Sequence, residues 1–476
     1  MRDLTEKSGI GRRALLAGAS AAAAAAALPG DGAAAAEPRG SQLPARGEYL
    51  VRGAAVITMD PALGDFATGD VHVRDGAIVA VGARLAAPRA SVIDGANMIA
   101  MPGLVDTHWH MWEGVARNLA GDEPKTGYFP HSRTLGVLFT PEDNARGVRL
   151  CLAEAIHSGI TTVHNWSHNN LSPAYAEAEL AVHRESGGRA RYSYGYSRKT
   201  GNNEMLPLDD IRAFHRKWFG GAGDRVLTFG IATRGPNNNP IEMCAQELRF
   251  ARELGVPLTT HVGIAPGKDS LVEPMAKAGL LGPDVLLVHA TNGTDAERQI
   301  LGETKTPVSC SPFTELRTGF GITPVRAFLA ANVPIGLSID TTVLCGNADM
   351  FAIMKVMQNI ADGTAPSEFA ITARRVLEMG TIGGARALGL DDRIGSLSPG
   401  KRADLILVRT GEINMAPMAD PARMIVQAAQ PANVDTVMVD GRILKRHGKL
   451  MTIDVARVMR EARETITRVS AQVGKS

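Results

Sequence analysis

The stretch Met101-Pro-Gly-Leu-Val-Asp-Thr-His-Trp-His110 decides the fold and carries the first sign of chemistry. Its apolar run is typical of a buried β-strand, and a strand sends alternate side chains to the same face. His108 and His110 can therefore present two imidazoles to one metal ion, while Trp109 points to the opposite face. Two surface histidines would show the same spacing, so the interpretation depends on ligands elsewhere in the chain.

Eight apolar runs of this kind follow one another, and helical patterns separate them, as in a chain of βα units. They cover residues 104–108, 161–165, 191–195, 226–232, 257–262, 285–290, 307–311 and 334–340. Eight parallel strands are the number that closes a (β/α)8 barrel. An open doubly wound sheet is the competing fold, but no G-x-G-x-x-G motif opens a helix after the first run. We therefore predict an α/β fold with a TIM-like barrel at residues 103–390.

Residue types that bind metals end three further runs, namely His261, His289 and Asp340. The carboxyl ends of parallel barrel strands meet at one mouth, where such barrels build their active sites. Imidazoles and carboxylates are ligands that zinc accepts, and a bound metal can lower the pKa of water from about 15.7 toward about 7. The sequence therefore predicts a metal-activated water at this mouth.

These residues resemble the amidohydrolase superfamily, in the branch of cytosine-deaminase-like and triazine-hydrolase-like enzymes that carry one metal. The resemblance rests on the 101–110 motif, on the histidines and aspartate above, on Asp349-Met350-Phe351, and on the tail at residues 394–408. It implies that one divalent metal, zinc or iron with zinc the preferred expectation, is held by four side chains: His108, His110, His261 and Asp340. It also implies that His289 lies beside the metal and contacts the attacking water or the substrate.

Two details refine this resemblance. The run at 226–232 holds no lysine, where two-metal relatives place a bridging lysine, so one metal is expected. Deaminases of the branch usually place a glutamate three residues after the fifth-strand histidine, and Ile264 occupies that position here. We therefore expect Asp340 to be the general base and His289 the acid or electrophile. Other acids that could replace the glutamate are Asp269, Glu273, Glu113 and Glu315.

Four side chains near the expected mouth are candidate contacts to the substrate: His164, His168, Glu315 and Trp112. A hydrogen-bonded loop histidine explains His164 or His168 equally well, and core packing explains Trp112. Four other histidines are expected at exposed positions and receive no role: His72, His183, His215 and His447.

The predicted function is that of a metal-dependent hydrolase acting on a C–N bond of a small cyclic or amide-like molecule. Deamination, ring opening and amide cleavage all fit this chemistry. A non-hydrolytic enzyme on the same barrel, such as a metal-dependent decarboxylase, is one alternative. A catalytically inactive metal-binding or ligand-binding homologue is another, suggested by Ile264.

Both ends of the chain are rich in β-structure. Strand patterns occupy residues 49–58, 69–74, 77–81 and 91–93 near one end, and 403–408, 434–439 and 442–445 near the other. Neither end has enough strands for a stable sheet alone. We predict a composite β-sandwich built from residues 37–102 and 391–476, with a C-terminal helix in the second part.

Residues 1–36 resemble a twin-arginine signal peptide. Arg12 and Arg13 precede an apolar, alanine-rich run, and Ala33 to Ala36 offer a cleavage site. The segment predicts export to the periplasm or beyond, and no membrane insertion after cleavage.

The formal net charge of +2 and the lack of a basic run with interleaved aromatics make nucleic acid an unexpected partner. The four cysteines lie far apart, so they predict buried free thiols rather than a thiolate metal site. We expect a small-molecule substrate, and the family resemblance allows a homodimer.

Overall fold

The computed structural model describes residues 43–221, 226–365 and 367–473. The predicted signal at 1–36 lies outside the described residues, so its export role stays a prediction. None of the helices in the described part of the chain combines the length and apolar character needed to cross a bilayer. The described cysteines are all unpaired, and three of the four are buried, as expected.

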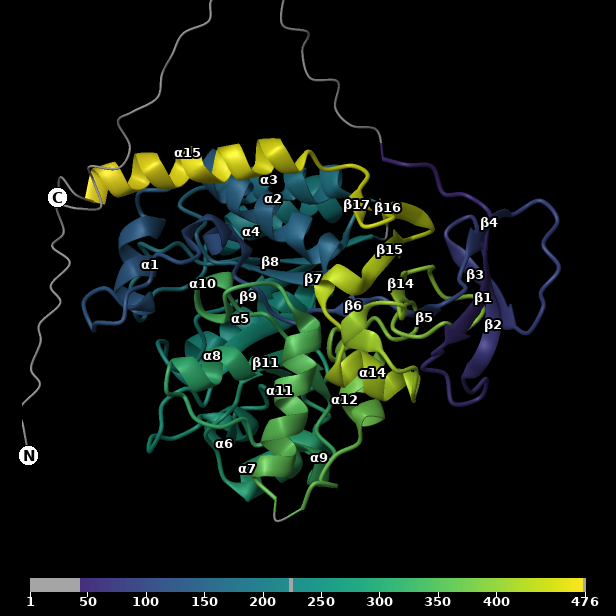
Figure 1. The fold of residues 1–476 in the computed structure, drawn as a ribbon. Coiled ribbons are helices and arrows are strands. Elements are labelled where there is room, and N and C mark those ends of the chain that lie inside the picture. Colours follow the sequence, from purple (N-terminus) through teal and green to yellow (C-terminus); the bar gives the residue numbers. More distant parts are fainter. Residues whose placement is uncertain (1–42, 222–225, 366, 474–476) are drawn as a thin grey trace, which may run out of the picture. The chain divides into compact units, whose positions relative to one another are not determined.

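A parallel sheet of eight strands forms the central barrel (Figure 1). Each of the eight predicted runs overlaps one strand: β6 (Leu104–Val105), β7 (Ile160–Ser167), β8 (Arg189–Gly195), β9 (Leu227–Ala232), β10 (Leu258–Val262), β11 (Val285–His289), β12 (Val308–Cys310) and β13 (Ile335–Leu337). The strands lie side by side in sequence order. The predicted barrel is therefore confirmed.

The chain segment after β6 closes this barrel, because it hydrogen-bonds to both of its neighbours. The Trp109 amide donates to the His164 carbonyl at 2.9 Å on the β7 side. On the other side the Asp340 amide donates to the His108 carbonyl at 2.9 Å, just beyond β13. The first and last strands are thus joined at the end of the barrel where the ligand-type residues lie.

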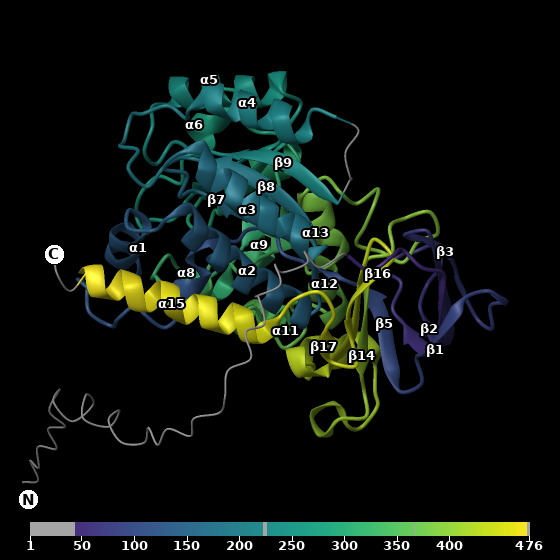
Figure 2. The same cartoon turned by 90° about the horizontal axis from the view of Figure 1, so that it is seen from above.

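Helices follow the strands and cover the outside of the barrel (Figure 2). The longest of these helices, α2, begins at a side-chain cap: Thr140 and Asp143 form a reciprocal capping box at its start, with Pro141 in its first turn. The helices of the barrel are α1 (Tyr128–Gly136), α2 (Pro141–His157), α3 (Pro173–Ser186), α4 (Leu208–Phe219), α5 (Ile241–Glu253), α6 (Val272–Lys277), α7 (Asp295–Glu303), α8 (Pro312–Arg317), α9 (Val325–Ala330), α10 (Thr342–Cys345), α11 (Met350–Gly363), α12 (Ala373–Met379), α13 (Ile382–Ala387) and the 3-10 helix η1 (Met111–Ala116).

The two ends of the chain pair into one nine-stranded sheet, as predicted. Its members are β1 (Tyr49–Val56), β2 (Phe66–Arg74), β3 (Ala77–Gly82), β4 (Ser91–Asp94), β5 (Met98–Pro102), β14 (Leu405–Arg409), β15 (Val434–Val439), β16 (Arg442–Arg446) and β17 (Lys449–Leu450). The two halves meet where β5 runs antiparallel to β14, with Leu405 opposite Pro102. The sequence prediction missed β5, because its residues are apolar on both faces and lack the alternation that marks a half-buried strand.

Three short helices and one long helix complete the C-terminal part: η2 (Ile413–Met415), α14 (Pro421–Gln427), η3 (Pro431–Asn433) and α15 (Val455–Val473). In Figure 1 α15 lies along α2, and Arg149 of α2 is paired with Glu461 of α15 at 3.0 Å. The barrel is tied to the composite sheet by a buried ion pair, in which Arg189 Nε lies 2.5 Å from Asp404 Oδ2. Since β5 leads directly into β6, the sheet also anchors the strand that carries the first two histidines.

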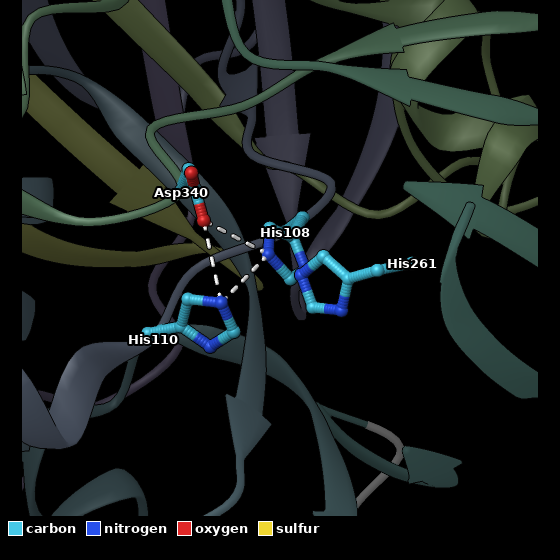
Figure 3. Close-up of side chains that lie close together, drawn as sticks. All are labelled: His108, His110, His261 and Asp340. Carbon is cyan, nitrogen blue, oxygen red and sulfur yellow. Dashed lines mark hydrogen bonds and ion pairs between the residues drawn. The ribbon is translucent and has the colours of Figure 1, made fainter. Parts of the chain in front are cut away.

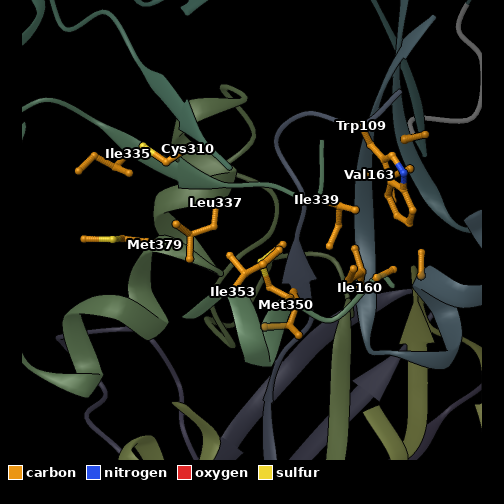
Figure 4. Packing of buried hydrophobic residues seen from close by; sticks show 14 of the residues in the cluster. Trp109, Ile160, Val163, Cys310, Ile335, Leu337, Ile339, Met350, Ile353 and Met379 are labelled. Carbon is orange, nitrogen blue, oxygen red and sulfur yellow. The ribbon is translucent and has the colours of Figure 1, made fainter. Parts of the chain in front are cut away.

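The apolar core lies between the barrel strands and the surrounding helices. Figure 4 shows Leu337 of β13 beside Ile353 of α11, with Trp109 and Val163 further along the same core. Trp109 is fully buried in this core, so it points away from the barrel interior, as the strand period predicted.

A polar group is embedded in the same layer, behind β7. Glu179 of α3 is fully buried and accepts hydrogen bonds from the amides of Asn144, at 2.8 Å, and Asn165, at 3.0 Å. His183 lies beside it, only 1% exposed, and receives the Asn165 amide at 3.0 Å. The expectation that His183 is exposed is therefore wrong, because α3 turns this face toward the barrel. His72 is buried as well, beside Glu48.

Glu179 yields a prediction about stability and pH. Burial raises its pKa from 4.5 to about 7, although its hydrogen bonds oppose the shift. Between these two values the folded protein holds a proton that the unfolded chain has released, so the free energy of unfolding falls as the pH rises. The difference between the two pKa values corresponds to a loss of about 3 kcal/mol in the free energy of unfolding. Urea titrations at pH 4.5 and 7.5 should show that Glu179→Gln loses less stability over this range than the native chain.

An equal loss of stability in both proteins would contradict the assignment. Glu185→Gln is the control, because Glu185 is exposed on the same helix.

Candidate metal centre and catalytic cavity

Four ligand-type side chains converge at the carboxyl ends of the barrel strands (Figure 3). His108, His110, His261 and Asp340 each offer one donor atom, and these atoms all lie within 4.8 Å of one another. The Oδ1 atom of Asp340 lies 3.1 Å from His108 Nε2 and 3.3 Å from His110 Nε2. The structure thus brings together the four residues that the resemblance implied.

The chemistry of this donor set fits a divalent metal. His108 Nε2 and His110 Nε2 lie 3.2 Å apart, close enough for both lone pairs to face one cation. Burial lowers the pKa of His108, His110 and His261 well below the ordinary value, which keeps the imidazoles neutral. Neutral imidazoles with one carboxylate are the ligands that zinc and similar ions select.

The strands that carry the ligands are locked together by Asp106, which the sequence prediction overlooked. Its Oδ1 accepts the His108 amide at 3.1 Å, and its Oδ2 accepts the Ile339 amide at 2.6 Å. One fully buried carboxylate therefore fixes the backbone beside ligands on the first and last strands. Asp340 adopts a positive φ of 62°, which for a residue other than glycine is a strained conformation found at functional sites. The Val-Asp-Thr-His order in the sequence was the available signal, since a buried strand seldom contains an unpaired aspartate.

His289 lies beside the cluster and is held from behind by Glu315. His289 Nδ1 is 3.2 Å from Glu315 Oε1, which also accepts the Ser311 amide at 2.8 Å. Burial opposes the charged form of His289, yet the Glu315 hydrogen bond and the nearby Asp340 carboxylate hold its pKa above the ordinary value. Glu315 is completely buried and also accepts the hydroxyl of Thr323. Its predicted contact to the substrate is therefore corrected, because it lies behind His289 rather than on the cavity wall.

A cavity of about 480 Å3 opens above the cluster. His110, His261, His289 and Asp340 line its inner end, and Ile264 contacts it too. The aromatic side chains on its wall are Tyr128, Phe129, Tyr196 and Phe320. This volume falls in the range of small-molecule sites.

Of the predicted substrate contacts, only His168 lines this cavity. Trp112 is 1% exposed and donates its indole N–H to His168 Nδ1 at 3.2 Å, so it supports that ring from behind. His164 is also 1% exposed, and its two ring nitrogens bond to the Thr107 carbonyl at 2.8 Å and the Ser193 hydroxyl at 2.7 Å. The predictions for Trp112 and His164 are therefore corrected. Both side chains are buried and hydrogen-bonded to other residues, and neither lines the cavity.

Arginines on the cavity wall were not predicted. Arg198 and Arg234 follow β8 and β9, and Arg133 comes from α1. Arg234 donates to the Thr200 carbonyl at 3.1 Å and to Asn202 Oδ1 at 2.8 Å, and it lies over the Tyr196 ring. Within the described residues none of these arginines forms an ion pair with a carboxylate. Their position directly after barrel strands was the signal, since such loops form the mouth.

The wall carries no carboxylate apart from Asp340, as far as the described residues extend. Asp269 and Glu273 are exposed in the region after β10. Glu113 is buried and accepts hydrogen bonds from Tyr128 at 3.0 Å and from Thr341 at 3.0 Å. None of the four acids that could have replaced the missing glutamate therefore lines the cavity.

Comparison with known proteins gives a consistent result. The model of the amidohydrolase family matches residues 99–444. The 5'-deoxyadenosine deaminase of Methanosarcina mazei is 31% identical over 441 residues, covering 90% of this chain and 99% of that protein. The 5-methylthioadenosine/S-adenosylhomocysteine deaminase of Pelotomaculum thermopropionicum is 29% identical over 436 residues, covering 88% and 98% of the two chains.

Solved structures share the fold. An adenosine deaminase from Xanthomonas campestris with bound zinc superposes with a TM-score of 0.81 at 24% identity, covering 90% of this chain and all of that one. A triazine hydrolase from Arthrobacter aurescens superposes with a TM-score of 0.78 at 22% identity, covering 88% and 99%. At these identities the likeness supports the barrel and its composite sheet.

The donor cluster predicts the metal content of the purified protein. We expect one zinc per chain by elemental analysis, and a loss of most of it in His261→Ala after dialysis. Removal of even a supporting group typically costs about 10- to 100-fold in metal affinity. The exposed His447, changed to alanine, should leave the content unchanged. A native content near two metals, or full retention by His261→Ala, would overturn the single-ion cluster.

Proposed function

The chain belongs to the amidohydrolase family and is a metal-dependent hydrolase of a C–N bond in a small molecule, and from this we propose how its residues act and what it binds. The single observation that carries the proposal is the convergence of three neutral imidazoles and Asp340 at the floor of a cavity. We propose that one zinc ion occupies this cluster. No second group of three ligand-type residues occurs in the described part of the chain, which supports a single ion.

A divalent metal at this cluster would supply Lewis acidity and a water of lowered pKa. Asp340 has one oxygen, Oδ1, turned to His108 and His110, so its carboxylate stands where it can accept a proton from the attacking water. His289 has its Nδ1 engaged by Glu315, which leaves Nε2 for the substrate. We assign His289 to donate a hydrogen bond to the oxygen or nitrogen on which charge develops.

The reaction proceeds without the glutamate on which ring deaminases of this branch rely. Ile264 presents an apolar side chain to the cavity at that position, and no other carboxylate on the described wall takes its place. Asp340 therefore has to accept the proton and return it to the departing nitrogen. This arrangement suits cleavage at a carbonyl or amidine carbon, where the leaving nitrogen lies next to the attacked carbon.

We further propose that the substrate carries an anionic group. Arg198 and Arg234 line the cavity, and neither has an ion-pair partner among the described residues. The buried Nε atoms of both side chains also lack a hydrogen-bond acceptor there. A carboxylate or phosphate would supply the missing counter-charge, because guanidinium groups bind such anions through their terminal nitrogens. The aromatic rings of Tyr196 and Phe320 would then contact a planar body.

Residues 1–36 are proposed to direct export through a twin-arginine route, with release to the periplasm or beyond. The support is the sequence itself: paired arginines, an alanine-rich run and a small-residue cleavage site. A homodimer stays a prediction from the family resemblance.

Asp340→Asn tests the catalytic assignment. We expect turnover to fall by about 100- to 10,000-fold, since the variant removes a general base as well as a charged ligand. Circular dichroism should report an intact fold, and metal analysis separates loss of the ion from loss of the base. Asp269→Asn, exposed in the loop after β10, is the matched control and should retain full activity. Near-native turnover by Asp340→Asn would refute the role.

The arginine pair predicts which substrates are preferred. A screen of cyclic amides and heterocyclic amines, each with and without a carboxylate, should show higher kcat/KM for the charged members. Arg198→Met and Arg234→Met should each raise KM for these substrates by about 10- to 100-fold, because a hydrogen bond to a charged group contributes about 1.5–3 kcal/mol. Their uncharged counterparts should change little. Lys199→Met, next to Arg198 and exposed, is the control, and equal effects on both substrate series would contradict an anion site.

A further inference from the structure

A second cavity lies at the opposite end of the barrel from the metal cluster. It encloses about 650 Å3 near the first residues of β8 and β9, and none of the four cluster residues lines it. Its wall includes Arg191 on β8, His183 on α3, Trp218 and Phe219 at the end of α4, and Phe229 on β9. The volume is in the range of small-molecule sites.

Arg191 is such a group. Its side chain is only 8% exposed, and it makes a single hydrogen bond, from Nη2 to the Leu388 carbonyl at 2.5 Å. Its Nε atom is buried without an acceptor, and no carboxylate in the described residues forms an ion pair with it. Burial lowers its pKa to about 10, which leaves the guanidinium charged at neutral pH. A buried charge without a counter-charge is destabilising, and the described residues supply none for Arg191, so this guanidinium is suited to bind an anionic ligand.

A second buried donor faces the same cavity. His183 receives the Asn165 amide on Nε2, so the neutral ring carries its proton on Nδ1. That Nδ1 atom is buried and has no hydrogen-bond partner in the described structure. Two donors on this wall, one of them charged, therefore lack acceptors.

The remaining wall supplies a surface for an apolar body. The rings of Phe219 and Phe229 lie 5.1 Å apart, and the guanidinium of Arg184 covers Trp218 at 4.5 Å. No aspartate or glutamate of the described chain lines the cavity. Its charge and its aromatic rings together select a ligand that has an anionic head and a ring.

We propose that this cavity binds a small organic carboxylate with an aromatic body, whose carboxylate pairs with Arg191 and whose ring lies against Trp218 and Phe219. The site is separate from the catalytic cavity, because it opens at the amino ends of the barrel strands. It does not depend on the proposed substrate of the metal centre.

Calorimetric titration with benzoate tests the proposal, with benzamide as the neutral ligand of the same shape. The titration uses the zinc-loaded full chain carrying Arg198→Met and Arg234→Met, so that the arginines of the catalytic cavity cannot hold the probe. We expect benzoate to bind in this background, and benzamide to bind at least about tenfold more weakly, as the loss of a charge-assisted hydrogen bond implies.

Adding Arg191→Met should weaken benzoate binding by about tenfold or more, and circular dichroism together with zinc content reports whether this variant is folded. Trp218→Leu provides an independent test at the partly exposed rim, and it should weaken benzoate without touching Arg191. Failure of benzoate to bind at millimolar concentration, or unchanged binding in both variants, would overturn the site. Inorganic phosphate that binds as tightly as benzoate would refute the aromatic half of the proposal.

Discussion

The barrel and its chemistry both depend on the extended segment between β6 and His110. Its backbone is hydrogen-bonded to β7 through Trp109 and to the end of β13 through His108 and Asp340. The same few residues therefore close the sheet and place two imidazoles and a carboxylate within reach of one ion. Asp106 reinforces this arrangement, because it accepts backbone amides from both strands. The hydrogen bonds that close the barrel therefore also position the side chains of the metal centre.

Two histidines on the cavity wall are hydrogen-bonded from behind by buried side chains, which gives their rings fixed orientations. Glu315 is completely buried and engages His289 on one nitrogen, so the ring has one orientation and one free nitrogen. Trp112 does the same for His168. Such support lets a side chain present a defined donor or acceptor without reorganisation during the reaction. Arg191 at the other end of the barrel is the contrasting case, a buried charge that the protein itself does not pair.

The sequence predicted the barrel strands and the ligand cluster for the same physical reason. Strand period and strand ends are local properties, and they determine which residues reach the mouth. The direction of each side chain beyond that point depends on packing between distant segments. The sequence placed the backbone of His164 and Glu315 near the mouth, but their side chains point into the fold. His164 is hydrogen-bonded to the Ser193 hydroxyl, and Glu315 accepts the Ser311 amide. β5 escaped detection because it is apolar on both faces, and Arg198 and Arg234 because a loop sequence does not reveal which residues face a cavity.

The replacement at Ile264 distinguishes this chain from the deaminases that it resembles. A glutamate there would give a second acid for the leaving group, and it would also place a negative charge in the cavity. With Ile264 the wall keeps the three arginines and a single described carboxylate, Asp340, which faces the imidazoles. Arginines on a wall without another carboxylate would favour the anionic substrate proposed above. Ile264 therefore bears on both proposals for this site: on the proton path, because the second acid is absent, and on the substrate's charge, because the wall that holds the arginines has no carboxylate at that position.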